Sequence, residues 1–460
     1  MKCAKRGFAL AMCSLTLLLG ACATTRVRAE ENNGTLASPV STTQTNNSMQ
    51  IGDKAVNSEE KTIYDDLDLS IFDTARYDNG KYMQYYWDSN ITYNESAMII
   101  RNADGTLDAV KLLFNVDEII SVRSADLQTK YEKDVDYKIE NGKLIILEDG
   151  NIPILEHDKI YFDTKPEVGA IGGTDGNGYF PTVDGKYEKY VEAGILYDYQ
   201  IAVTYYHRDK GNYTVPATQS KEFDGVIGKL ERGESVNIAC LGDSISNGSN
   251  ASGFFSTKLN PCMPSYFGLV GDYIKAKYHY KNVYLYESGE AYVADKENEE
   301  TRIKMTNFSV GGKDTYWGVT QTEAVAAVKP DLVILGFGMN DGSAYTGEKA
   351  YYNNMMKIIE EIRAVNPACE FVVLGTMLPN ENICWSEGGK SILGNQEKYL
   401  LKLQTLAQEE VGVALADITT LHKEYLTVKN YRDMTGNNVN HPNDFLVRLY
   451  AQTIVKTIFG

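Results

Sequence analysis

The sequence places residues suited to acyl transfer after several apolar stretches of its second half. Ser244 ends a Gly-Asp-Ser tripeptide, and a pair of glycines that ends at Gly312 follows another apolar stretch. Asn340 follows a third apolar run, and His441 precedes an amphipathic segment. A serine hydroxyl becomes a nucleophile when a neighbouring imidazole accepts its proton. Because amide N–H groups stabilise the oxyanion that then forms, these residue types predict ester hydrolysis through a serine nucleophile.

The segments around these residues alternate between apolar strands and amphipathic helices. Apolar runs end just before Ser244 and Asn340, which predicts that both residues follow buried strands. Such alternation builds a parallel sheet covered by helices on both faces, and ligands bind beyond the carboxyl ends of its strands. The predicted strands span 235–242, 331–338, 370–378 and 413–418, and the predicted helices span 265–278, 349–365, 395–412 and 443–459.

Four short blocks in this order resemble those of the SGNH (GDSL) hydrolase superfamily, from about residue 235 to residue 460. The blocks are Gly242 to Ser244, Asn307 to Gly312, Gly338 to Asp341 and His441-Pro442. The resemblance implies an α/β fold of three layers around a flavodoxin-like parallel sheet. It also implies that Ser244 is the nucleophile and His441 the general base. The implied oxyanion donors are the backbone N–H groups of Ser244 and Gly312 and the side chain of Asn340, and no cofactor or metal is expected.

One position departs from the family pattern. The family usually carries an aspartate three residues before the histidine, and here that position is Asn438. An amide oxygen can accept a hydrogen bond from the imidazole, yet it cannot offset the imidazolium charge that forms during attack. Three alternatives stay open: Asn438 orients the ring, a backbone carbonyl does so in a Ser-His dyad, or a carboxylate such as Asp433 or Asp444 substitutes. The dyad is the preferred interpretation.

Other polar residues receive structural interpretations. Asp243 is expected to cap the turn before Ser244 through local hydrogen bonds. Cys240 lies in an apolar strand and is expected to be a small core residue. No disulfide is assigned to the remaining cysteines, Cys262, Cys369 and Cys384. The other histidines lie outside the four blocks and are expected on the surface or in loops; they are His157, His207, His279 and His422.

The N-terminal residues read as an export signal and a tether. Residues 1–22 have a basic start, an apolar run and a lipobox-like finish, so Cys22 is the expected site of lipidation. The alternative is simple secretion, with cleavage after Ala29. Residues 23–62 are polar and are expected to form a disordered tether. The protein is therefore expected outside a bacterial cell, anchored by lipid or secreted.

The middle of the chain carries strand signals. Residues 63–230 hold short runs of β-branched and aromatic residues, with Asn141-Gly142 at the bend of one predicted hairpin. This sequence pattern predicts an accessory all-β domain, a sandwich with jelly-roll-like character. Residues 231–460 are the predicted hydrolase domain.

Charge and aromatic content narrow the class of substrate. The chain has 45 basic and 62 acidic residues, a net charge of −17, which argues against a nucleic acid or an anionic lipid surface as partner. Trp317 and Trp385 follow predicted site segments and are expected to border the cleft, although Trp317 can instead pack within its own helix. The predicted function is removal of short acyl groups, above all acetyl, from acetylated oligo- or polysaccharides. The alternatives are a general short-chain or cell-wall O-acetyl esterase and a non-catalytic sugar-binding lipoprotein.

Overall fold

The structure, a computed structural model, describes residues 68–166, 177–192, 194–254, 257–286 and 303–460. The predicted signal at 1–22, the lipidation site at Cys22 and the tether at 23–62 lie outside these residues. In the described ranges, no helix combines the length and the apolar character needed to cross a membrane.

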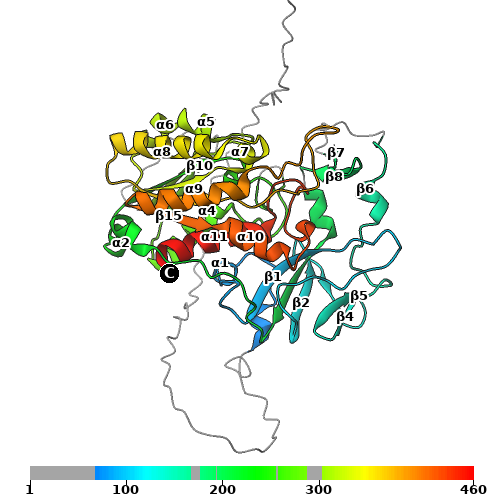
Figure 1. The fold of residues 1–460 in the computed structure, drawn as a ribbon. Helices are drawn as coiled ribbons and strands as arrows, with labels where there is room; N and C mark the ends of the chain where they lie inside the picture. The colour runs from blue at the N-terminus through cyan, green and yellow to red at the C-terminus, as the bar shows by residue number, and fades with distance from the viewer. Residues whose placement is uncertain (1–67, 167–176, 193, 255–256, 287–302) are drawn as a thin grey trace, which may run out of the picture. The chain divides into compact units, whose positions relative to one another are not determined.

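A six-stranded parallel sheet forms the centre of the C-terminal half (Figure 1). Its order is β11-β12-β10-β13-β14-β15, so the first strand of this half, β10, lies inside the sheet with later strands on both sides. Such a change of direction creates a crevice at the carboxyl ends of the strands. The bounds are β10 Val236–Gly242, β11 Val283–Tyr286, β12 Ile303–Asn307, β13 Leu332–Gly336, β14 Glu370–Gly375 and β15 Val413–Asp417.

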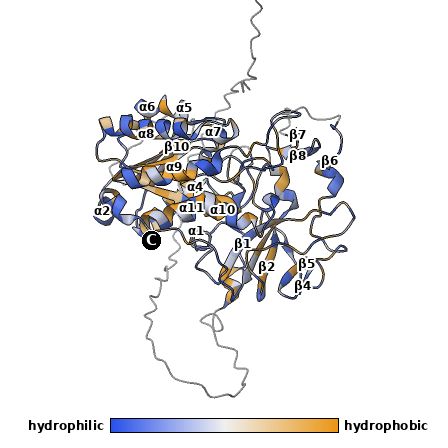
Figure 2. Cartoon of the chain, viewed as in Figure 1, coloured by the Kyte–Doolittle hydropathy of each residue, from blue (hydrophilic) through white to orange (hydrophobic). Residues whose placement is uncertain are grey.

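Helices cover both faces of this sheet, as predicted. Alternate residues of β10 face opposite ways: Ile238 packs in one apolar cluster with α4 and α11, and Leu241 packs in another with α8 and α9. Both β10 and α11 stand out among the apolar elements in Figure 2. The helices of this half are α3 Ser244–Asn247, α4 Tyr266–Lys277, α5 Thr315–Val319, α6 Thr322–Ala327, α7 Met339–Ser343, α8 Glu348–Val365, α9 Gln396–Glu409, α10 Ile418–Leu426 and α11 Asp444–Phe459, with the 3₁₀ turn η6 at Tyr431–Asp433.

Antiparallel sheets precede this half, so the predicted fold class is confirmed. One sheet has the order β1-β9-β2-β3, a second β6-β8-β7, and β4 pairs with β5 in the predicted hairpin. Asn141 and Gly142 adopt positive φ angles of 51° and 73° at its bend. The bounds are β1 Ile91–Met98, β2 Glu118–Ser124, β3 Lys130–Tyr131, β4 Tyr137–Glu140, β5 Lys143–Ile146, β6 Tyr161–Phe162, β7 Asn177–Pro181, β8 Tyr187–Val191 and β9 Gln200–Tyr206.

Short helices flank the antiparallel sheets. They are α1 Asn79–Tyr82, ahead of β1, and α2 Asp224–Glu231, between β9 and β10. The described residues of the same region also form the 3₁₀ turns η1 Leu69–Phe72, η2 His157–Lys159, η3 Gly194–Tyr199 and η4 Ser220–Phe223. Phe223 and Leu230, from η4 and α2, are buried in the same apolar cluster as β10.

The antiparallel region and the parallel sheet share one apolar core. Tyr205 of β9 belongs to the same cluster as Phe445 of α11. The buried guanidinium of Arg448 donates to the carbonyl oxygen of Tyr93 over 2.6 Å. From residue 68 onward, the described chain packs as one compact unit.

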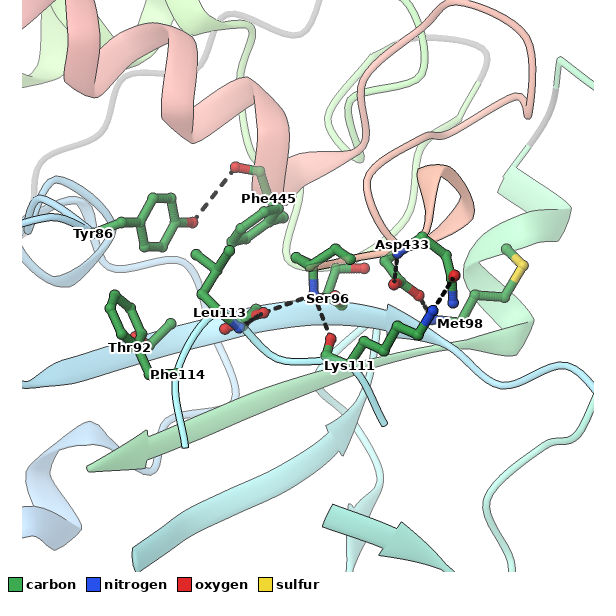
Figure 3. Close-up of polar contacts among 12 residues, drawn as sticks. Tyr86, Thr92, Ser96, Met98, Lys111, Leu113, Phe114, Asp433 and Phe445 are labelled. Carbon is green, nitrogen blue, oxygen red and sulfur yellow. Dashed lines mark hydrogen bonds and ion pairs between the residues drawn. The ribbon is translucent and has the colours of Figure 1, made fainter. Parts of the chain in front are cut away.

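A buried ion pair reinforces this junction beside β1. Lys429 Nζ lies 2.6 Å from Glu95 Oε1, and neither side chain is exposed. The ammonium also donates to the carbonyl oxygens of Ser96 and Lys111, and Asp433 accepts from the backbone N–H of Met98 nearby (Figure 3). Because a buried charge is costly unless it is paired and hydrogen-bonded, these contacts fix how the antiparallel region meets the segment that leads to His441.

Candidate active site

Ser244 lies at the carboxyl end of β10, where the strand turns sharply into α3. The strand ends at Gly242, where a Cβ atom would collide with the carbonyl oxygen of Gly336, so a glycine is required. Asp243 is the N-cap of α3 and accepts a hydrogen bond from the N–H of Ile245 over 2.9 Å, which confirms its predicted role. Burial raises the pKa of Asp243 to about 7. The turn therefore presents the hydroxyl of Ser244 at the first position of a helix.

The structure brings Ser244 and His441 together. The distance from Ser244 Oγ to His441 Nε2 is 2.8 Å. His441 lies just before α11, and its backbone N–H donates to the side-chain oxygen of Asn437 over 3.0 Å. Both Ser244 and His441 are buried, so the hydrogen bond lies in a site of low solvent access. This is the geometry in which an imidazole can accept the proton of a serine hydroxyl.

The other ring nitrogen of His441 bonds to Asn250. His441 Nδ1 lies 2.6 Å from Asn250 Oδ1. The amide nitrogen of Asn250 donates to the backbone carbonyls of Glu192 and Gly436, over 3.2 and 3.3 Å. With the amide held in this direction, its oxygen can only accept, so Nδ1 carries the proton and Nε2 is free to accept from Ser244. Asn250 thus selects the tautomer that a general base needs.

This finding corrects the expectations for the residue that orients His441. The side chain of Asn438 donates to Glu188 Oε2 and to the carbonyl of Lys189, over 3.3 and 2.8 Å, and does not face the imidazole. Its amide oxygen accepts from the amide of Asn380 over 3.4 Å, so both ends of this side chain bond to groups other than the ring. The expected dyad oriented by a backbone carbonyl is replaced by the Asn250 side chain.

The two proposed substitute carboxylates are also engaged elsewhere. Asp433 accepts from the N–H groups of Met98 and Asn430. Asp444 accepts from the N–H of Ser252 over 2.7 Å. The carboxylate that approaches His441 is instead Glu192, which follows β8 and whose Oε2 lies 3.4 Å from Nδ1.

The loop that carries Gly311 and Gly312, called the glycine loop below, forms the other side of the site together with α7. A Cβ atom on Gly311 would lie 3.7 Å from that of Ser244, whereas Gly312 has a positive φ of 73° and faces open space. Asn340, the second residue of α7, donates one amide hydrogen to the carbonyl of Lys313 over 2.8 Å. That bond holds its side chain against the glycine loop and leaves a second amide hydrogen for a ligand.

Asp341 holds the end of this loop through hydrogen bonds to Thr315. Its carboxylate accepts from the N–H of Thr315 over 3.1 Å and from the Thr315 hydroxyl over 2.5 Å. Burial raises the pKa of Asp341 to about 6, against the hydrogen bonds from Thr315, which lower it. The block from Gly338 to Asp341 therefore positions the glycine loop as well as Asn340.

The two tryptophans have different surroundings. Trp317 is partly buried within α5, with its ring centroid 6.4 Å from that of Phe337, which matches the alternative that it packs in its own helix. Trp385 is 45% exposed and meets the ring of Phe180 edge-on at 5.3 Å. Phe180 packs with Val439, two residues before His441. Trp385 therefore packs, through Phe180, beside the segment that precedes His441.

Two of the other histidines are buried: His422 contradicts the expected surface or loop position, whereas His207 lies in the loop after β9, as expected, but inside the core. His207 stacks on Phe114 at a centroid distance of 3.9 Å and is fully buried. His422, within α10, accepts from the N–H of Leu378 and is also fully buried. Burial lowers the pKa of His207 to about 4 and that of His422 to about 3. Both are therefore neutral core residues near neutral pH.

The cysteines and acidic residues show no further site in the described part of the chain. Cys240 is buried in β10, as predicted, and Cys262, Cys369 and Cys384 are free thiols. Among the described residues, no group of histidine, cysteine and acidic side chains is arranged to hold a metal ion.

Residues 240–445 match the sequence profile of the GDSL-like Lipase/Acylhydrolase family. This part of the chain belongs to that family. The matched range includes Ser244, the glycine loop, Asn340 and His441, whereas Glu192 lies outside it. A search of curated protein sequences found no match.

Solved structures similar to this chain include several esterases. A two-domain esterase active on acetylated mannans is 19% identical, with a TM-score of 0.37; the match covers 52% of this chain and 53% of that one. This chain thus spans about half the length of that esterase. A carbohydrate esterase of family 3 from Talaromyces cellulolyticus is 18% identical over 48% of this chain and 94% of its own, with a TM-score of 0.34. A peptidoglycan O-acetylesterase is 10% identical over 52% and 96%, with a TM-score of 0.38.

Proposed function

We propose that this protein is a serine ester hydrolase that removes acetyl groups from carbohydrates, with Ser244 as nucleophile and His441 as general base. The observation that carries the proposal is the 2.8 Å contact between Ser244 Oγ and His441 Nε2, at the carboxyl end of a central strand. His441 accepts the hydroxyl proton while Oγ attacks the ester carbonyl carbon. The resulting tetrahedral intermediate expels the alcohol, which takes the proton back from the imidazolium.

The donors around Ser244 are arranged for the negative charge of that intermediate. The N–H of Ser244 lies in the first turn of α3 and therefore has no partner within the helix. The second amide hydrogen of Asn340 and the N–H groups of the glycine loop complete the proposed oxyanion hole. Water, activated by His441 in the same way, then hydrolyses the acyl-enzyme and releases the acid.

The preference for a short acyl group and a sugar rests on the surface beside these residues. Among the described residues, the exposed large apolar side chains of the glycine loop, of α5 and of the loop after β14 are Val310, Tyr316 and Trp385. Two of the three are aromatic, and aromatic faces suit the flat apolar faces of sugar rings. A single valine offers little apolar area for a long acyl chain. An acetylated oligo- or polysaccharide is therefore the proposed substrate.

Acetate release tests this function. The purified protein is incubated with acetylated xylan, acetylated mannan and O-acetylated peptidoglycan, and with p-nitrophenyl acetate and octanoate. We expect acetate release that Ser244→Ala and His441→Ala reduce by at least about 10³-fold, and faster cleavage of the acetate than of the octanoate. Ser249→Ala, a matched serine replacement in the same loop, serves as control. Ester hydrolysis that survives in Ser244→Ala would overturn the proposal.

The N-terminal residues support a proposal about location. We propose that Cys22 carries lipid and anchors the protein at the outer face of a bacterial membrane. In cells labelled with a lipid precursor, we expect label on the wild type and none on Cys22→Ala, which should then leave the membrane fraction. A labelled Cys22→Ala protein would contradict the anchor.

A further inference from the structure

We infer that Glu192, a residue of the antiparallel region, supplies the negative charge that Asn438 cannot supply, and acts as a positioning residue for His441. The inference rests on the proposed function. It assigns part of the active site to a segment that lies outside the range matched by the hydrolase family.

The carboxylate approaches the ring nitrogen that bears the proton. Glu192 Oε2 lies 3.4 Å from His441 Nδ1, while the neutral oxygen of Asn250 lies 2.6 Å from the same nitrogen. Asn250 therefore makes the shorter hydrogen bond and selects the tautomer, whereas Glu192 adds the charge. An opposite charge at this distance stabilises the imidazolium that forms when Ser244 loses its proton.

The backbone and the side chain of Glu192 both belong to this assembly. Its carbonyl accepts from the amide of Asn250, and its Oε1 accepts from the amide of Asn437 over 3.3 Å. The oxygen of Asn437 in turn accepts from the N–H of His441. Asn250 and Asn437 thus connect Glu192 to the histidine by two separate chains of hydrogen bonds. These contacts hold the carboxylate beside the imidazole.

The end of β8 is fixed against the loop that carries His441. The N–H of Val191 donates to the carbonyl of Asn437 over 3.3 Å. On the neighbouring strand β7, the carbonyl of Pro181 accepts from the N–H of Cys384 over 2.8 Å. These backbone contacts hold the small sheet β6-β8-β7 against the loops that contain Cys384 and Asn437. The position of Glu192 beside His441 therefore depends on this tertiary packing and not on the local sequence around His441.

The ionisation state of Glu192 agrees with this role. Burial alone would raise the pKa of Glu192, but the charge of His441 and hydrogen bonds from His441, Asn437 and Tyr190 hold that pKa below its ordinary value. The carboxylate is therefore charged at neutral pH. Its side chain is 37% exposed, and solvent weakens the interaction accordingly.

Other titratable groups near His441 are few in the described residues and do not replace Glu192. Asp243, at the start of α3, interacts with the charge of His441 but is used as the cap of Ile245. Asp444, on the same segment as His441, faces Ser252 and Tyr197. The cation Arg432, in the segment that leads to His441, is paired with Glu188 at 3.0 Å.

The test compares variants that separate charge from shape. Glu192→Gln keeps the size of the side chain and removes its charge; we expect kcat to fall about 10-fold, with KM changed less than about 2-fold. The acidic limb of the pH–rate profile should move to lower pH, because the protonated imidazole loses an opposite charge. Glu192→Asp should restore most of the rate. Asp163→Asn is the matched control and should leave the activity unchanged; it removes an exposed carboxylate that follows β6 and pairs with Lys186, the residue before β8.

The outcomes separate this inference from the proposed function. If Ser244→Ala is inactive while Glu192→Gln keeps the wild-type kcat and pH profile, the role of Glu192 is overturned and the esterase proposal stands. If the wild type cleaves no ester, the NMR titration of His441 in labelled protein, assigned with His441→Ala, decides instead. A midpoint at lower pH in Glu192→Gln than in the wild type supports the inference, and an unchanged midpoint overturns it.

Discussion

The amide nitrogen of Asn438 lies 3.3 Å from the carboxylate oxygen of Glu188. An aspartate at position 438 would therefore face another buried carboxylate and the carbonyl of Lys189. We expect Asn438→Asp not to raise kcat, and to lower the free energy of unfolding by about 1–3 kcal/mol, the cost of an unpaired buried polar group. Steady-state kinetics and urea unfolding measure the two effects. A gain of ten-fold or more in kcat would show that position 438 does reach His441.

Removal of the amide at position 340 tests the proposed oxyanion hole. Asn340→Ala should lower kcat about 10²–10³-fold, because one preorganised donor is lost where negative charge develops. KM should change little, since the donor acts mainly on the intermediate. Asn353→Ala, on the exposed side of α8, is the control. A fall confined to KM would instead assign Asn340 to substrate binding.

The two glycines of the loop should respond differently to alanine. At Gly312, with a φ of 73°, any side chain is strained, so Gly312→Ala should lower the free energy of unfolding by about 1 kcal/mol and reduce activity as the loop shifts. At Gly311 an added methyl group has room but lies beside Ser244. We expect Gly311→Ala to keep its melting temperature and still lose kcat. Equal melting temperatures for both variants would contradict the difference in backbone strain.

The tryptophans offer a matched pair for substrate binding. Trp385→Ala removes a half-exposed ring that packs on Phe180 and should raise KM for acetylated polysaccharide several-fold, with KM for p-nitrophenyl acetate unchanged. Trp317→Ala removes a ring packed on Phe337 and should mainly lower the melting temperature. If Trp385→Ala acts equally on both substrates, the ring does not contact the sugar.

The buried histidines predict a pH dependence of stability. Because burial lowers the pKa of His422 to about 3, the unfolded chain binds a proton between pH 6.5 and about 3 that the folded chain does not. The contribution of His422 to stability is therefore present above pH 6.5 and is lost as pH falls through this window. The difference in unfolding free energy between the wild type and His422→Leu should shrink toward acid by up to about 1.4 kcal/mol per pH unit. A difference that stays constant with pH would contradict a neutral His422.

The sequence alone was enough to predict those site residues whose positions are set by a strand a few residues earlier in the chain. Ser244 lies two residues beyond the end of β10, and Asn340 lies four residues beyond the end of β13, so recognition of each strand also placed the residue. The alternating strands and helices predicted the layers of the parallel sheet for the same reason.

Other features depend on packing that no local pattern encodes. Asn250 and Glu192 meet His441 from 191 and 249 positions away along the chain. Neither residue belongs to a recognisable motif; the only local signal for Asn250 is its place in the asparagine-rich loop after Ser244. His207 lies in a loop, as predicted, but its burial was not predictable because it comes from stacking on Phe114, a residue far away in the sequence.

The buried contacts around Arg448 and Lys429 bear on how the protein can be engineered. A chain cut before β10 would keep every residue of the family match, yet it would leave both cations without the oxygen atoms that now surround them. It would also lose Glu192. A truncated catalytic fragment is thus a poor reagent for biochemistry, and chimaeras that exchange the front half for another binding module would need to rebuild this junction residue by residue.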